Sequence, residues 1–142
     1  MSKKSRSEGN RVAMAIKANK SSYYISDVDL EDNYEDVLAA ATSVRKILKE
    51  LPSGFLLISA GIVRITVIVD TKNKDLSAKE WLTAAMSEIT YQIDGDDDYA
   101  KTTIEIDTPF KLKDIVRGQA FAFLRKNGEL EEESEDEEYY EF

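Results

Sequence analysis

Four residues near the end of the chain have the types and spacing to bind a nucleic-acid strand. They recur at intervals of four, which places them on one face of a helix: Lys113, Arg117, Phe121 and Arg125. Basic side chains can follow a phosphate backbone, and an aromatic ring among them can stack on an unpaired base. The alternative is a solvated helix face, on which Phe121 packs beside the core and the cations suit the helix C-terminus. The pattern alone leaves both interpretations open.

Other basic residues could extend this surface. Residues 1–20 hold six Lys and Arg residues against a single acid, Glu8. Basic ends of this kind contact nucleic acid in some proteins and only aid solubility in others. The predicted nucleic-acid site consists of Arg11, Lys17, Arg64, Lys111, Lys113, Arg117, Phe121 and Arg125.

The chain ends in an acidic tail (residues 129–142) with nine acidic side chains and no basic one. The net charge is −9, so residues 1–128 are formally neutral. Most acidic tails only aid solubility, but this one finishes with Tyr139, Tyr140 and Phe142. An aromatic ring embedded in acid is typical of a short linear ligand, whose ring fills a pocket while its carboxylates pair with Lys or Arg. We therefore expect these three residues to bind partner proteins.

The stretch Glu131–Phe142 resembles the tail of bacterial and phage single-stranded DNA-binding proteins, in which an acidic run ends in phenylalanine. The resemblance covers about a tenth of the chain and is one of composition. It implies a tail that recruits replication or repair proteins and competes with DNA for the protein's own basic surface. The body departs from the five-stranded OB-fold barrel, because three helices are expected here. A small helix-and-sheet body with such a tail is more similar to the archaeal type called ThermoDBP, from which no contact residue is carried over.

Residues suited to catalysis or metal binding are scarce. The chain has no histidine and no cysteine, which removes the commonest general base and the imidazole and thiolate metal ligands. Its six glycines fit neither a phosphate loop nor a dinucleotide fingerprint. The run Asp94–Asp98 lacks the spacing of an EF-hand and is better interpreted as a solvated hairpin loop. We therefore expect no enzymatic activity, no cofactor and no metal.

Nothing in the sequence predicts a membrane protein. The longest apolar stretch, Phe55–Val69, is interrupted by polar residues and is shorter than the roughly 20 residues that cross a bilayer. The basic residues 1–10 are not followed by the apolar segment of a signal peptide. A chain without cysteine fits a reducing compartment, so the expected location is the cytoplasm.

The elements that must position these residues follow from apolar periodicity. Val12, Met14 and Ile16 alternate, which predicts a strand at residues 11–18. Further strands are expected at residues 23–25, 55–59, 62–69, 90–93 and 102–106. Helices are expected from the N-cap Asn33 to Pro52, at residues 78–88 after the capping box that begins at Ser77, and at residues 110–126 after Thr108 and Pro109.

The expected fold is α+β, with a mostly antiparallel sheet of about four to six strands and three helices on one side of it. Residues 1–10 are expected to form a flexible basic arm, residues 11–128 a single α+β domain, and residues 129–142 a disordered tail.

The predicted function is binding of single-stranded nucleic acid, with DNA as the expected ligand and replication or repair proteins as partners of the tail. The alternative is an acidic interaction protein or inhibitor that mimics nucleic acid. In that case the acids of residues 27–36, residues 94–98 and the tail would occupy a basic groove of another protein. The sequence leaves open the choice between DNA and RNA, the oligomeric state and the identity of the tail's partner.

Overall fold

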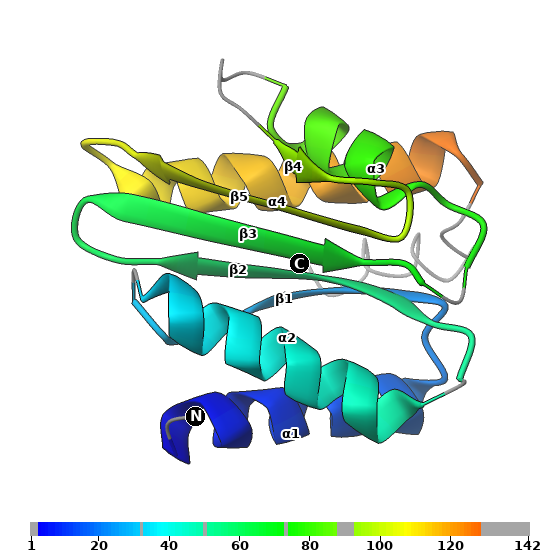
Figure 1. The fold of residues 1–142 in the computed structure, drawn as a ribbon. Helices are drawn as coiled ribbons and strands as arrows, with labels where there is room; N and C mark the ends of the chain where they lie inside the picture. The colour runs from blue at the N-terminus through cyan, green and yellow to red at the C-terminus, as the bar shows by residue number, and fades with distance from the viewer. Residues whose placement is uncertain (1–2, 32, 50, 73, 88–92, 129–142) are drawn as a thin grey trace, which may run out of the picture.

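A computed structural model describes residues 3–31, 33–49, 51–72, 74–87 and 93–128 of the chain (Figure 1). The elements in chain order are α1 (Lys3–Asn19), β1 (Tyr23–Asp27), α2 (Tyr34–Leu48), β2 (Gly54–Ala60), β3 (Arg64–Asp70), α3 (Ala78–Ala85), β4 (Asp94–Gly95), β5 (Tyr99–Glu105) and α4 (Pro109–Lys126). The predicted α+β class is confirmed, and the described residues form four helices rather than three.

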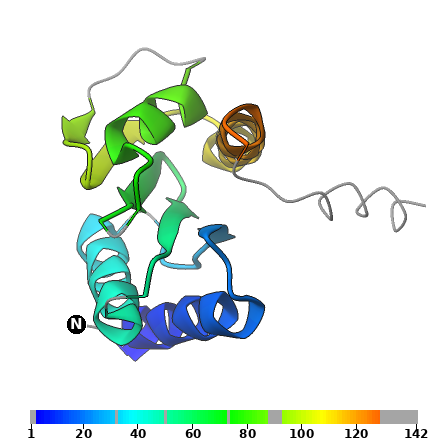
Figure 2. The same ribbon diagram turned by 90° about the vertical axis from the view of Figure 1, so that its right-hand side faces the viewer.

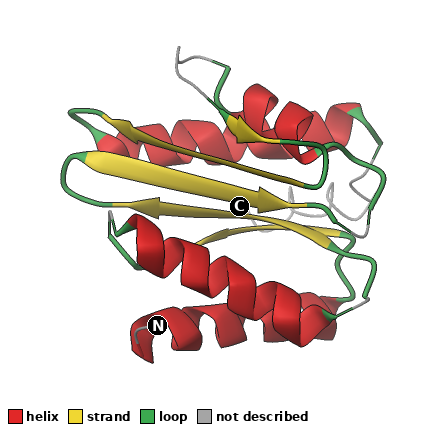
Figure 3. Cartoon of the chain, viewed as in Figure 1, coloured by secondary structure: helices red, strands yellow, loops and turns green. Residues whose placement is uncertain are grey.

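The five strands form one mixed sheet in the order β1-β2-β3-β5-β4 (Figure 3). Strand β1 pairs with β2 in parallel, and α2 provides the crossover between them. The other three pairings are antiparallel, which confirms the prediction of a mostly antiparallel sheet. Of the strand predicted at residues 90–93, residues 90–92 lie outside the described ranges.

Helices cover both faces of the sheet, so the prediction of helices on one side was wrong. Helices α1 and α2 lie below the sheet in Figure 1, and α3 and α4 lie above it. Strand β2 is buried at every position because each face of it meets a helix layer. Phe55 and Leu57 pack with α1 and α2, whereas Leu56 and Ile58 pack with α3 and α4.

Helix α1 covers residues 3–10 of the predicted flexible arm and the whole strand predicted at residues 11–18. Residues 1–2 and the tail predicted to be disordered, residues 129–142, lie outside the described ranges. The buried residues of α1 recur every three or four positions: Ser5, Gly9, Val12, Ala13 and Ile16. The strand prediction placed Met14 on the same buried face as Val12, but in the helix Met14 is 60% exposed. A side chain at Gly9 would put its Cβ 2.8 Å from Ser43 Cβ, so the glycine lets α1 approach α2 closely.

The predicted helix starts agree with the structure. Asn33 accepts a side-chain hydrogen bond from the Asp36 amide at 3.1 Å, and Ser77 accepts one from the Glu80 amide at 3.2 Å. Pro109 is the first residue of α4, although the Thr108 side chain makes no capping bond. Because α4 begins and ends near the predicted boundaries, the spacing of its basic residues can be read directly onto one helix face.

Two buried polar contacts tie the layers together. The Trp81 indole N–H donates to the Ala120 carbonyl at 3.2 Å and joins α3 to α4. Arg45 Nη2 lies 2.8 Å from Asp70 Oδ1 and joins α2 to the end of β3. Neither layer includes a membrane-crossing helix, since none in the described ranges is both long enough and apolar enough.

Candidate nucleic-acid interface

Two strongly basic helices flank the edge strand β1. Helices α1 and α4 together carry ten Lys and Arg residues and two acids. In Figure 2 they lie on either side of β1, which is the outermost strand at this edge of the sheet. The opposite edge is formed by β4, and the turn that follows β4 contains Asp96, Asp97 and Asp98. Acids also lie at the β1 edge, where Lys4 Nζ is 3.1 Å from Asp29 Oδ2, but the cations of α1 and α4 outnumber the acids of the same helices.

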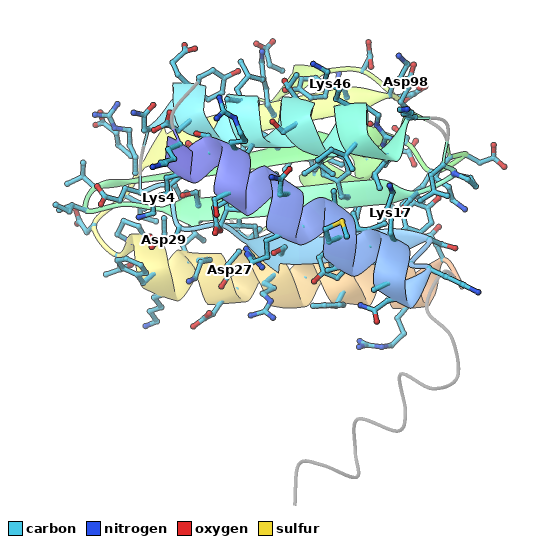
Figure 4. All side chains as sticks on the ribbon, turned by 90° about the horizontal axis from the view of Figure 1, so that it is seen from below. Lys4, Lys17, Asp27, Asp29, Lys46 and Asp98 are labelled. Atoms are coloured by element: carbon cyan, nitrogen blue, oxygen red, sulfur yellow. The ribbon has the colours of Figure 1, made fainter. Side chains whose placement is uncertain are left out.

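Asp27, the last residue of β1, is the point where cations from both helices converge. Lys113 Nζ and Arg117 Nη1 lie 3.2 Å and 4.0 Å from Asp27 Oδ2. From the other side, Arg11 Nη2 donates to the Asp27 carbonyl at 2.7 Å. Figure 4 shows Asp27 between α1 and α4. The structure thus brings three of the predicted site residues, Arg11, Lys113 and Arg117, to one place.

Glu8 fixes the orientation of Arg11 in this cluster. Arg11 Nη2 donates to Glu8 Oε1 at 2.9 Å, and the same oxygen accepts the Asp29 amide at 3.1 Å. Burial acts to raise the pKa of Glu8, but the hydrogen bonds from Arg11 and Asp29 outweigh it and leave the pKa below 4.5. The bond to Glu8 also raises the pKa of Arg11. Both side chains are therefore charged at neutral pH.

Phe121 is not an exposed stacking ring. It is half-buried and packs against the hydrophobic core between the sheet and α4. The aromatic ring that does face solvent is Phe110, which is 61% exposed and has Lys113 Nζ 5.4 Å from its centroid. Phe110, Lys113 and Arg117 are three and four residues apart, so they share a helix face. The sequence analysis did not select Phe110. Its position could have suggested exposure, because it does not share the spacing of the apolar residues Leu112, Val116 and Ala120.

The remaining predicted residues do not join this cluster. Lys111 and Arg125 are exposed on α4, at its two ends. Arg64 lies on the α2 side of the sheet, because the next residue, Ile65, packs in the core with α4 and successive side chains of a strand alternate between the faces. Lys17 lies at the C-terminal end of α1 and lines a separate hollow. We therefore define the α1–α4 face by Phe110 and the three cations around Asp27, which are Arg11, Lys113 and Arg117.

An open hollow on β5 is the main competing site. It has a volume of about 650 Å³, and Tyr34, Asp94 and Lys101 line it. Lys101 Nζ lies 5.6 Å from the ring centroid of Tyr34, whose hydrogen bond raises the pKa of Lys101. Burial raises the pKa of the neighbouring Tyr99 to about 12, so its phenol stays protonated. Asp94 beside the single ammonium makes this hollow less suited to a phosphate strand than the α1–α4 face.

The acids of the turn after β4 are used within the protein. Asp96 Oδ1 accepts the amides of Asp98 and Tyr99 at 2.8 and 3.1 Å. Asp97 Oδ1 accepts the Ser77 hydroxyl at 2.6 Å, and the Asp97 carbonyl accepts the Ala78 amide at 2.8 Å. These bonds hold the turn against the start of α3. No group of three or more potential metal ligands comes together in the parts of the chain described.

Comparisons with known proteins place the chain in no family. No family model matches it, and no curated sequence matches it. Among solved structures, it is similar to an exonuclease RecJ bound to manganese, with a TM-score of 0.49 and 15% identity over 82% of this chain and 28% of that chain. RecJ from Thermus thermophilus in complex with Mg²⁺ gives a TM-score of 0.46 at 14% identity, over 82% of this chain and 18% of that one. The chain thus spans less than a third of either RecJ chain, and a likeness of this size carries no argument about function.

Proposed function

We propose that this protein binds single-stranded nucleic acid, with DNA as its expected ligand, on the α1–α4 face. The protein is non-catalytic and acts in the cytoplasm. The observation that carries the proposal is the meeting of Arg11, Lys113 and Arg117, from two strongly basic helices, at the edge strand β1. A cluster of cations on one face of a formally neutral body is an electrostatic footprint for a phosphate backbone.

The binding mode follows from the order of side chains along α4. Arg11, Lys113 and Arg117 supply cations from two helices, so a strand between α1 and α4 would meet basic groups on both sides. Phe110 supplies an exposed ring at the N-terminal end of α4, where an unpaired base could stack. Single strands suit this arrangement better than duplex, because stacking needs a base that is not already paired.

The acidic tail has two roles in this proposal. Tyr139, Tyr140 and Phe142 recruit replication or repair proteins, and the carboxylates compete with nucleic acid for the basic face. A tethered competitor works at high effective concentration, so even weak contacts of the tail reduce strand binding. The competition weakens as salt rises, because the charges are screened beyond about 8 Å at physiological ionic strength.

The proposal is tested by titrating a fluorescent single-stranded oligonucleotide with the full chain at two salt concentrations. Lys113→Ala/Arg117→Ala should weaken binding and lower the slope of log affinity against log salt by about 1.4, since each phosphate contact contributes about 0.7. Lys46→Ala/Lys79→Ala is the matched control, because it removes the same charge from exposed positions on α2 and α3. Equal losses in the two variants would argue against a specific face, and no binding by the native chain at either salt would leave the proposal without support.

A further inference from the structure

A hollow with an apolar floor and a lysine rim lies where α1 and α2 end. Its volume is about 630 Å³. The floor includes Ile47, Leu51 and Pro52, and the rim is formed by Lys17, Lys20 and Lys49. Leu51 is a large apolar side chain with 38% of its surface exposed. The hollow therefore suits a ligand that combines a ring or other apolar group with negative charge.

Two of the rim lysines occupy backbone conformations that favour glycine. Lys20 has φ 52° and directly follows α1, and Lys49 has φ 54° and directly follows α2. Both φ values are positive, a region that glycine adopts without strain and that residues with a side chain seldom occupy. The chain instead places a long cation at both positions, so two ammonium groups are held at the same hollow at some cost in backbone energy.

The end of this chain has the complementary chemistry. Its last five residues are Glu138, Tyr139, Tyr140, Glu141 and Phe142, which combine three aromatic rings with two carboxylates. A ring can fill the apolar floor while the carboxylates pair with the lysine rim. The hollow on β5 is less apolar, because Asp94, Lys101 and two threonines line it beside Tyr34.

The tail is also long enough to arrive there. Fourteen residues follow Gly128, and they can span at most about 46–50 Å when extended. The ends of α1, α2 and α4 all lie at the right-hand end of the molecule in Figure 1. A folded body of this size has a radius of gyration of only about 14 Å, so the tail can reach the hollow of its own chain.

We propose that the tail's last five residues dock in the hollow bounded by Lys17, Lys20 and Lys49 of the same chain. Docking buries the rings and places the tail's carboxylates beside α1. The competition described under the proposed function would then start from a defined resting site. Docking is measured without oligonucleotide, so its failure and the failure of nucleic-acid binding are distinguishable.

The test uses the full chain with a nitroxide spin label on Ser134→Cys, which is a unique thiol because the chain has no cysteine. At low salt the spin label should broaden the amide signals of Ile47, Lys49 and Leu51 most strongly in a ¹H–¹⁵N spectrum of the ¹⁵N-enriched chain. Tyr139→Ala/Tyr140→Ala/Phe142→Ala should abolish the broadening while leaving the folded body untouched. Lys20→Glu/Lys49→Glu should also abolish it, whereas Lys46→Glu/Lys79→Glu should retain it as a matched control.

Three results would overturn the proposal. The first is broadening that persists in both the tail variant and the Lys20→Glu/Lys49→Glu variant. The second is broadening centred on Lys113 and Arg117 instead of on the hollow. The third comes from a mixture of two proteins, one that carries the spin label but no ¹⁵N and one that carries ¹⁵N but no spin label. If the amide signals of this mixture broaden as much as those of the doubly labelled chain, the tail docks on a second copy and not on its own chain.

Discussion

Lys113 Nζ and Asp27 Oδ2 lie 3.2 Å apart, and this ion pair joins α4 to the outermost strand of the sheet. Arg117 approaches the same carboxylate oxygen at 4.0 Å, and Arg11 donates to the carbonyl of the same residue. The side chain of Lys113 is only 21% exposed, so the pair is partly shielded from solvent. One acid thus organises the basic face and also neutralises part of its charge.

Replacing that acid should therefore strengthen nucleic-acid binding. In Asp27→Asn, Lys113 and Arg117 keep their positions on α4 but lose the competing carboxylate. Oligonucleotide affinity should rise roughly two- to fivefold, which corresponds to about 0.5–1 kcal/mol for a partly exposed ion pair. Asp98→Asn removes an exposed acid near the opposite edge of the sheet and should change affinity much less. An equal gain in both variants would mean that only the overall charge matters.

Phe110 and Phe121 of α4 should respond in opposite ways to truncation. Phe110→Ala should weaken oligonucleotide binding by about 1–3 kcal/mol if a base stacks on the ring, and it should leave the melting temperature nearly unchanged because the ring is exposed. Phe121→Ala should lower the unfolding free energy by about 2 kcal/mol, less than for a fully buried ring. Thermal melting and oligonucleotide titration of each variant check both expectations. If Phe121→Ala weakens binding without loss of stability while Phe110→Ala does not weaken binding, Phe121 is the stacking residue.

How far the sequence predicts this fold depends on the element. Helices α2 and α4 followed from apolar stripes and start signals that involve residues close in sequence. Helix α1 was missed because two of its buried positions are Ser5 and Gly9, which carry no apolar signal. They are small because α2 packs closely there, and that requirement arises only in the folded protein. The unbroken apolar run at Phe55–Ile58 was the available sign that both faces of the sheet are covered.

The candidate site was predicted only in part for a similar reason. The interval of four between Lys113 and Arg117 correctly placed both on one face, because helix periodicity is local. The contacts of these two residues with Arg11 and Asp27 depend on how α1, β1 and α4 pack together. Residue spacing within one element does not predict that packing. Phe121 has the right interval but packs against the core, since a stripe of period four drifts around a helix of 3.6 residues per turn.

Acid should destabilise the protein partly through Glu8. Its pKa in the folded protein lies below 4.5, so its contribution to stability is present above that pH and is lost as the pH falls through the folded-state pKa. Urea unfolding should show Glu8→Gln less stable than the native chain at pH 7. The difference should shrink as the pH drops below about 4.5. A difference that stays constant from pH 7 to pH 3 would mean that ionisation of Glu8 is not what stabilises the contact.

The buried ion pair between Arg45 and Asp70 should be sensitive to removal of one partner. Their side chains are 15% and 10% exposed, and the pair closes the gap between α2 and β3. Asp70→Ala should lower the unfolding free energy by about 3–5 kcal/mol, because it leaves a buried guanidinium without its counter-charge. The double variant Arg45→Met/Asp70→Leu should be less destabilised than Asp70→Ala in chemical denaturation. If the double variant is the less stable one, the pair contributes more than its desolvation costs.

Deletion of residues 129–142 tests the central claim most directly. Circular dichroism first establishes that the chain ending at Gly128 is folded, and a labelled single-stranded oligonucleotide is then titrated at low and moderate salt. Removing nine acidic side chains should tighten binding, with the larger gain at low salt, where the tail competes most strongly for the α1–α4 face. A nucleic-acid mimic would instead bind a basic partner less well after truncation and gain no affinity for an oligonucleotide. A folded, truncated chain that binds neither single-stranded DNA nor RNA at low salt would contradict the proposed function.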